Sequence, residues 1–146
     1  MKKGFTILEL VIVLSVLVIL IGIAIPRMKG MQQAGQLAQA KAELQTLQAA
    51  MESYYSNTSP HTYPTAGTIA SPCSSYFANA TPAIVPGTCP TDPFSSSAAE
   101  YEAIVSGNYY VIASVGTGAN LTGLSLSGST VTKGTGNICV TNGSGC

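Results

Sequence analysis

The sequence opens with MKKGFTILELVIVLSVLVILIGIAIP, residues 1–26 of a chain of 146. Residues 10–25 carry no charge, and residues 5–8 extend the apolar run upstream with only Glu9 interrupting it. At about 1.5 Å per residue, a helix over residues 5–25 is roughly 30 Å long, the thickness of the hydrocarbon core of a bilayer. The stretch therefore predicts a membrane-spanning helix.

Two lysines, Lys2 and Lys3, precede the apolar run, and positive charge of this kind stays on the cytoplasmic side of a membrane. The residues after Pro26 are then expected outside the cytoplasm. All four cysteines lie in that part, which agrees because disulfides persist in oxidising compartments. We expect a single-pass protein of the inner (cytoplasmic) membrane.

The stretch KKGFTILE, residues 2–9, resembles the signature of type IV prepilins, in which a short basic leader ends in Gly and a Glu is fifth in the mature chain. The resemblance implies that a prepilin peptidase cuts between Gly4 and Phe5 and methylates the new amino group of Phe5. Pro26 falls where this family carries a proline that loosens the helix. The implied plan is a leader (1–4), a transmembrane and filament-core helix (5–25), an amphipathic helix (26–55) and a globular head (56–146).

Glu9 needs an explanation because a carboxylate inside an apolar membrane helix is costly unless it is paired or neutralised. Cleavage would supply a partner, since the amine of Phe5 is positively charged and can meet Glu9 of a neighbour in a staggered bundle of identical helices. A misplaced subunit would leave a buried charge alone, so the pair would set the register of a helical homopolymer. The apolar surface that holds the subunit in the bilayer would pack against its neighbours there. Phe5, Glu9 and Pro26 are the expected assembly residues.

A second helical pattern follows the apolar run. Residues 31–55 are rich in Ala, Gln, Leu and Glu and contain one Gly and no Pro. Apolar residues recur there in steps of three and four, which predicts one stripe on a helix. The simplest prediction is one long helix over residues 5–55. The stripe consists of Leu37, Ala40, Leu44, Leu47, Met51 and Tyr54.

The rest of the chain predicts a small β-structure after a long connection. Residues 56–107 hold all but one of the prolines, so they predict an irregular αβ loop. Residues 109–115, 121–127 and 137–141 predict three strands of an antiparallel meander within residues 109–146. The predicted fold class is α+β, a long N-terminal helix packed on a small antiparallel β-sheet, type IV pilin-like.

The four cysteines allow three disulfide connectivities, which the sequence alone does not separate. We favour the two local pairs, Cys73 with Cys89 and Cys139 with Cys146. Bridges of this kind would fasten a small exported head that has little core of its own.

Several function classes lack support. Six Lys and Arg balance six Asp and Glu, so no positive field favours nucleic acid. His61, the only histidine, lies among Pro and Ser residues, so we predict no enzyme, no metal site and no cofactor. We interpret Asp92, Glu100 and Glu102 as surface charges, because they follow no cation-binding spacing.

Two alternatives explain the N-terminus without assembly. An ordinary secretory signal would be cleaved after Ala24, where Gly22 and Ala24 supply small residues. A plain anchor would carry an extracytoplasmic binding domain. Neither alternative gives a reason for Glu9.

Two relatives share the prepilin signature: type IV pilins, which serve adhesion, twitching motility and DNA uptake, and major pseudopilins of type II secretion. Tyr63-Pro64-Thr65, PTDPF at residues 90–94 and residues 109–120 resemble the pseudopilin, but no acidic residue after Asn120 matches its Ca²⁺ loop, and the C-terminal cysteine resembles a pilin. We predict a subunit of a type IV pilus-like filament, with the pseudopilin as alternative. Expected partners are its own copies, the membrane, prepilin peptidase, a platform protein and an assembly ATPase, and the expected final location is an extracellular pilus or a periplasmic pseudopilus.

Overall fold

The computed structural model describes residues 4–64, 71–77, 80, 84, 89–118 and 120–146, without the side chains of residues 25–27 and 71. The chain divides into an N-terminal part, Met1–Gly35, and a C-terminal part, Gln36–Cys146, each described by itself. Lys2 and Lys3 lie outside the described residues, so the predicted membrane orientation stays a prediction.

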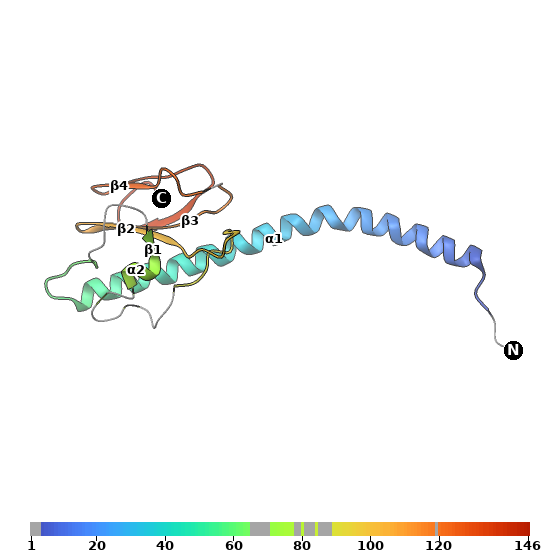
Figure 1. The fold of residues 1–146 in the computed structure, drawn as a ribbon, viewed down its shortest axis with the longest axis horizontal. Helices are drawn as coiled ribbons and strands as arrows, with labels where there is room; N and C mark the ends of the chain where they lie inside the picture. Colours follow the sequence, from blue (N-terminus) through green and yellow to red (C-terminus); the bar gives the residue numbers. More distant parts are fainter. Residues whose placement is uncertain (1–3, 65–70, 78–79, 81–83, 85–88, 119) are drawn as a thin grey trace. The chain divides into compact units, whose positions relative to one another are not determined.

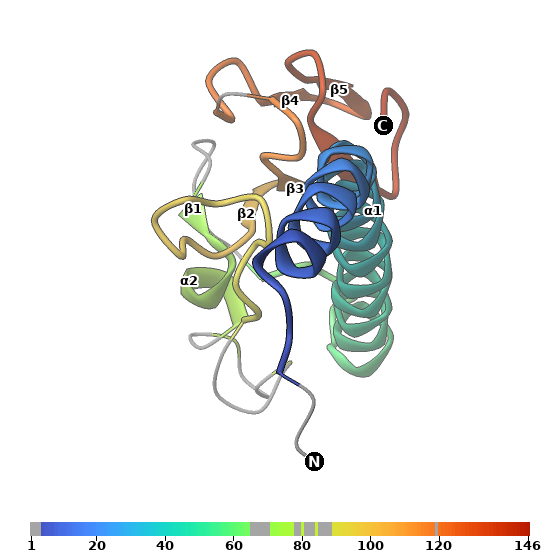
Figure 2. The same cartoon turned by 90° about the vertical axis from the view of Figure 1, so that its right-hand side faces the viewer.

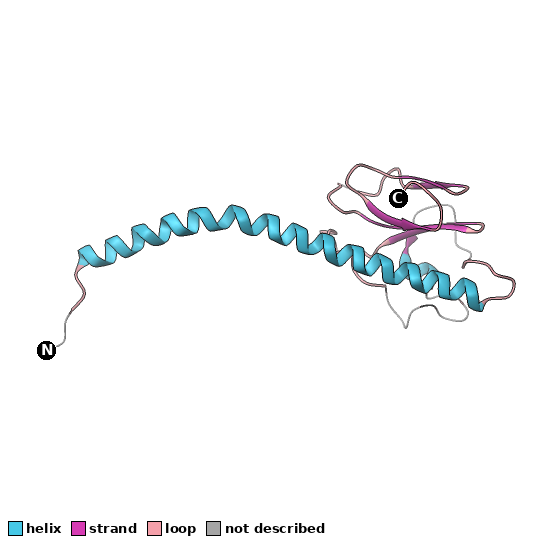
Figure 3. Ribbon diagram, turned by 180° about the vertical axis from the view of Figure 1, so that it is seen from behind, coloured by secondary structure: helices cyan, strands magenta, loops and turns pink. Residues whose placement is uncertain are grey.

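A single helix, α1 (Ile7–Asn57), confirms the long helix predicted over residues 5–55 (Figure 3). It begins where the hydroxyl of Thr6 accepts a hydrogen bond from the amide of Glu9 at 3.3 Å, which satisfies one of the free N–H groups of the first turn. The helix continues through Pro26 and ends before the Ser59-Pro60 pair. The apolar run and the stretch rich in Ala, Gln, Leu and Glu that follows it thus form one continuous helix.

The described residues of the C-terminal part form one further short helix and six strands. Four strands form an antiparallel sheet in the order β1-β2-β3-β6, and β4 pairs with β5 in a separate two-stranded sheet (Figure 1). Together with α1 they give the predicted α+β, pilin-like arrangement. The elements are β1 (Ser71–Pro72), α2 (Cys73–Phe77), β2 (Glu102–Ser106), β3 (Tyr109–Ser114), β4 (Ser125–Ser127), β5 (Thr130–Thr132) and β6 (Ile138–Thr141).

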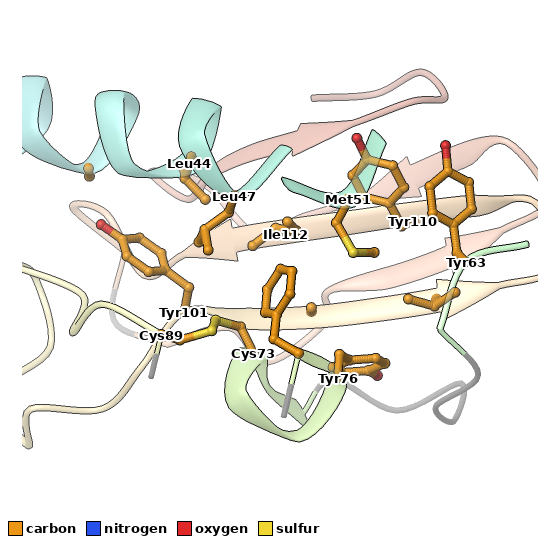
Figure 4. Packing of buried hydrophobic residues seen from close by; sticks show 14 residues of the cluster. Leu44, Leu47, Met51, Tyr63, Cys73, Tyr76, Cys89, Tyr101, Tyr110 and Ile112 are labelled. Carbon is orange, nitrogen blue, oxygen red and sulfur yellow. A yellow bond between two sulfur atoms is a disulfide. The ribbon is translucent and has the colours of Figure 1, made fainter. Parts of the chain in front are cut away.

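One face of the four-stranded sheet packs on the stripe of α1 predicted from the sequence (Figure 4). Four stripe residues are buried and two, Leu37 and Tyr54, are half-buried. Alternate residues of β2 and β3 and the side chains of α2 complete this core. It includes Ala40, Leu44, Leu47, Met51, Cys73, Tyr76, Phe77, Tyr101, Ala103, Val105, Tyr110 and Ile112.

The opposite face of the same sheet packs against the second sheet and the turn before it (Figure 2). Because successive side chains of a strand point to opposite faces, the residues between those of the first core fall on this side. Burial of both faces explains why β3 reads as an almost continuous apolar run. This second core consists of Ile104, Val111, Ala113, Leu121, Leu124 and Val131.

The predicted three-strand meander is wrong in its pairing. Strand β3 lies between β2 and β6, while the 121–127 segment contributes only β4, in the other sheet. Strand β2 falls within residues 56–107, which we expected to be irregular, as do β1 and α2. The number of prolines obscured an apolar run, AIV, and the Gly107-Asn108 pair, a hairpin signal in which Gly107 adopts φ +59°.

Two carboxylates beside the stripe tie α1 to the sheet through tyrosine hydroxyls. Glu52 accepts hydrogen bonds from Tyr63 at 3.0 Å and from Tyr110 at 2.8 Å, and Glu43 accepts one from Tyr101 at 2.5 Å. Burial raises the pKa of all three hydroxyls, and the neighbouring carboxylates raise it further. The tyrosines therefore remain protonated donors at neutral pH.

We expect Glu52→Ala to lower the free energy of unfolding by about 2 to 4 kcal/mol, since it removes two charge-assisted hydrogen bonds and leaves two half-buried or buried hydroxyls without their acceptor. Urea unfolding of the full chain in detergent, followed by tyrosine circular dichroism, measures the change. Gln45→Ala, on the exposed side of α1, is the matched control and should stay within about 0.5 kcal/mol of wild type. Equal stability of the two variants would contradict the role of Glu52.

Candidate processing and assembly site

The predicted cleavage site lies in an exposed segment before α1. Gly4, Phe5 and Thr6 have no regular secondary structure and are exposed. A Cβ added at Gly4 would meet no atom within 4 Å, so packing within the chain does not require glycine at this position. A requirement for Gly4 would therefore come from an external enzyme that reads the sequence.

The first turns of α1 present apolar side chains on every side. All residues from 7 to 24 are exposed, including Ile7 at 85% and Leu8 at 71% of their surface. Among the described residues α1 is long and apolar enough to cross a membrane. An apolar surface of this size needs lipid or protein to cover it.

Glu9 is the one charged residue in this surface, and it lies in the first turn of α1. Within the described part of the chain its carboxylate has no hydrogen bond or ion pair. Thr6 and Glu9 also have the Thr-x-x-Glu spacing of a capping box, a signal that the sequence analysis missed. Glu9 thus has two candidate roles, helix capping and pairing with a charge outside its own chain.

Each of the three segments that resemble a pseudopilin head contributes buried residues to the C-terminal part: Tyr63, Asp92 and residues 110–114. Tyr63 stacks on Tyr55 with ring centroids 4.8 Å apart and meets the ring of Tyr110 edge-on at 4.9 Å. Thr65 lies outside the described residues. The PTDPF segment meets the end of β3 through Asp92.

Asp92 is buried, with 3% of its surface exposed, so its interpretation as a surface charge is wrong. Its carboxylate accepts hydrogen bonds from the hydroxyl of Ser114 at 2.9 Å and from two amides, those of Val115 at 2.7 Å and Phe94 at 3.0 Å. Four lone-pair sites of a carboxylate make these bonds possible at once. Asp92 therefore fastens the loop before β2 to the end of β3.

The turn after β3 is closed by backbone and amide groups. Gly116 adopts φ +58°, and a Cβ there would lie 2.2 Å from the carbonyl oxygen of Gly136, so only glycine fits. The side-chain amide of Asn137 donates to the carbonyls of Val115 at 2.8 Å and Asn120 at 3.1 Å. These contacts hold the turn closed with groups of the chain itself.

The other two candidate carboxylates have different surroundings. Glu100 accepts a hydrogen bond from the amide of Ser74 at 3.1 Å. Glu102 is half-buried, and burial raises the pKa of its carboxyl group. The only group of potential metal ligands in the described ranges is Glu100 with Cys73 and Cys89, whose sulfurs are bonded to each other and cannot act as thiolate ligands.

Both disulfides are the local pairs that we favoured. Cys73 pairs with Cys89 across 6.0 Å between Cα atoms, and Cys139 pairs with Cys146 across 5.3 Å. The first bridge lies in the core cluster, next to α2 (Figure 4). The second connects β6 to the segment that follows it, so the bridges fasten two loop-rich regions.

The sequence analysis missed the acceptor roles of Glu43, Glu52 and Asp92. A signal existed for the first two, because both lie beside stripe positions of a helix in a chain with seven tyrosines. Buried tyrosine hydroxyls need acceptors, and the carboxylates next to the stripe were the nearest ones available.

We expect Asp92→Asn to lower the free energy of unfolding by about 2 to 3 kcal/mol, because the amide replaces an acceptor oxygen with a group that faces donors. Urea unfolding of the full chain in detergent measures the loss. Ser96→Ala, an exposed change in the same loop, is the control and should have little effect. Wild-type stability of Asp92→Asn would show that the three hydrogen bonds contribute nothing net.

Residues 1–25 match the family described as the prokaryotic N-terminal methylation motif, which is typical of type IV pilins and type II secretion pseudopilins. No curated protein and no solved structure matches the chain significantly. The chain carries a prokaryotic N-terminal methylation motif at the start of a long apolar helix, within a pilin-like α+β fold.

Proposed function

We propose that this chain is the precursor of a structural subunit of a type IV pilus-like filament. It is cleaved between Gly4 and Phe5, methylated on Phe5 and held in the inner membrane by residues 5–25 until it is assembled. The observation that carries the proposal is the exposed apolar start of α1 with a single carboxylate, within the matched methylation motif.

The apolar surface suits both states of such a subunit. In the membrane, lipid covers it, and most backbone groups of residues 7–24 are satisfied within the helix, except the N–H groups of the first turn and the Gly22 carbonyl, whose usual donor is replaced by Pro26. In a filament, the same surface is covered by the helices of neighbouring copies, so the transfer loses little apolar burial. One helix surface can therefore serve as both anchor and filament core.

Glu9 supports assembly more than simple anchoring. In an anchor the carboxylate could serve only to cap the helix, whereas a staggered homopolymer can also pair it with the amine of Phe5 from a neighbour. The pairing would favour one register, since other registers leave Glu9 or the amine unpaired in apolar surroundings. Pro26 keeps its predicted role in loosening α1 as part of this proposal.

The partners follow from the motif. A prepilin peptidase would process the chain, and a platform protein and an assembly ATPase would drive the polymer. The proposed role is structural and requires no catalytic site, cofactor or nucleic acid. Adhesion, twitching motility and DNA uptake are the functions of such filaments that the chain would share.

A major pseudopilin of type II secretion is the second candidate. It is favoured by Asp92, which ties the Asp-Pro-Phe segment to β3 in a head that resembles the pseudopilin's. The two candidates differ in location, since a pilin appears in surface filaments that can be sheared off and a pseudopilin stays in the periplasm. A membrane-anchored extracytoplasmic binding domain is the third candidate, and it predicts no polymer.

Processing is tested first by the intact mass and N-terminal sequence of the chain from its native membrane and sheared-surface fractions. We expect a chain that starts at methylated Phe5, and we expect Gly4→Ala to accumulate as uncut precursor. Gly22→Ala is the matched control, because a Cβ at either glycine meets nothing within 4 Å. A native chain that starts at Ile25 would refute the proposed cleavage, as would full processing of Gly4→Ala.

Assembly is tested by substitutions of Glu9 that separate its two candidate roles. Glu9→Gln retains a capping-box residue but removes the charge, whereas Glu9→Ala removes both. If pairing is the role, both variants should be stable and cleaved, and both should give roughly tenfold fewer sheared filaments than wild type. Ser15→Ala, elsewhere on the same apolar surface, is the control. Normal filaments from Glu9→Gln would assign Glu9 to capping and refute the pairing.

A further inference from the structure

The carboxylates of the C-terminal part differ in whether they have a partner. Glu43 and Glu52 accept hydrogen bonds from tyrosine hydroxyls. Asp92 accepts hydrogen bonds from a serine hydroxyl and two amides, and Glu100 accepts one from the amide of Ser74. Glu102 has no hydrogen bond or ion pair with any residue that the structure describes. It is the one acidic side chain of this part left without a donor.

Glu102 lines a pocket of about 270 Å³ at the start of β2. Hydroxyl and amide side chains from two loops line the pocket together with Glu102, and four apolar side chains form the rest of the wall. Burial raises the pKa of the Glu102 carboxyl group, as expected for a carboxylate partly removed from water without a compensating donor. Besides Glu102 and Gly118, the polar lining is Ser95, Ser96, Ser97 and Asn120, and the apolar lining is Phe94, Ala99, Val115 and Leu121.

The chemistry of the pocket suits a lysine side chain. An ammonium group has three donors and no acceptor, and the pocket offers a carboxylate with hydroxyl and amide oxygens around it. The apolar stem of lysine can pack along Phe94 and Leu121 while the charged end reaches Glu102. One carboxylate is too few for Ca²⁺, which takes six or more oxygen ligands and usually several carboxylates.

The chain itself carries lysines that are available for this contact. Lys29, Lys41 and Lys133 are exposed, and none forms an ion pair with the described residues. Within the described residues of one chain, none of these lysines pairs with Glu102, although both kinds of group are present. In a homopolymer every copy brings both groups to its neighbours.

We propose that the Glu102 pocket receives a lysine side chain from a second copy of this chain and forms an ion pair between subunits. The proposal rests on the proposed function, because it requires a filament. It extends that function by placing a contact between subunits at the C-terminal part of one of them, separate from the contact of Glu9 with Phe5.

Carbodiimide cross-linking of sheared wild-type filaments tests the contact directly, since it joins a carboxylate to a lysine only where the two are paired. We expect cross-linked dimers on a denaturing gel, and mass spectrometry should find Glu102 joined to Lys29, Lys41 or Lys133. Glu102→Gln should abolish this dimer and reduce the filament yield roughly tenfold. Its cleavage and urea unfolding midpoint should match those of wild type.

Glu100→Gln is the matched control. It makes the same change in charge two residues away and keeps an acceptor for the amide of Ser74, so we expect wild-type filaments and cross-links. Exchanging the two charges tests whether assembly can be restored. Glu102→Lys alone should block assembly, and the double variant that also replaces the cross-linked lysine by Glu should assemble again.

The outcomes separate this inference from the function on which it rests. Wild-type filaments without a Glu102 cross-link, together with a normal yield from Glu102→Gln, would overturn the inference and leave the filament subunit standing. A correctly cleaved wild-type chain that forms no filament in its native cell would overturn both. A Glu102 cross-link to a different protein would also overturn it, because the partner would not be a second copy.

Discussion

The structure depends on how the apolar surface of one helix is covered. From Ala40 to Met51, α1 is apolar along a single stripe, and the sheet and α2 of the same chain cover that stripe. From residue 7 to 24 it is apolar on all sides, and nothing in the described chain covers it. The first surface is covered when the chain folds, whereas the second needs lipid or another protein to cover it. The chain is therefore built to fold alone at one end and to depend on its surroundings at the other.

The charged groups of the chain also differ in whether the chain itself satisfies them. With few charges, the chain satisfies most of its carboxylates with neutral donors: tyrosine hydroxyls for Glu52, a serine hydroxyl and backbone amides for Asp92. Such bonds fix the sheet on α1 and join the loops without placing a cation in the core, where the desolvation of two charges would be expensive. The lysines of the described chain are consequently free for contacts outside the subunit.

Sequence patterns predicted those features that depend on local composition. The spacing of the stripe residues was enough to predict this part of α1 and its buried side, because steps of three and four place apolar residues on one face of a helix and do not fit a strand. The pairing of β3 between β2 and β6 was not predictable in this way, since strand order depends on contacts distant in sequence. Asp92 was misjudged for the same reason: two of its three donors, Ser114 and Val115, are 22 and 23 residues away in the sequence. The position of Glu102 in a pocket needed the folded loops around it.

Glu9 and Glu102 are best understood together. Each is a carboxylate without a partner among the described residues, the first in an apolar helix surface and the second in a pocket of the C-terminal part. A contact at the start of the helix alone would fix how far neighbouring subunits are displaced along the filament, but it would leave each subunit free to rotate about its helix axis. A second ion pair between the same subunits would remove this freedom. A helical polymer with one symmetry needs both constraints, and in this chain two unpaired carboxylates in separate parts can supply them.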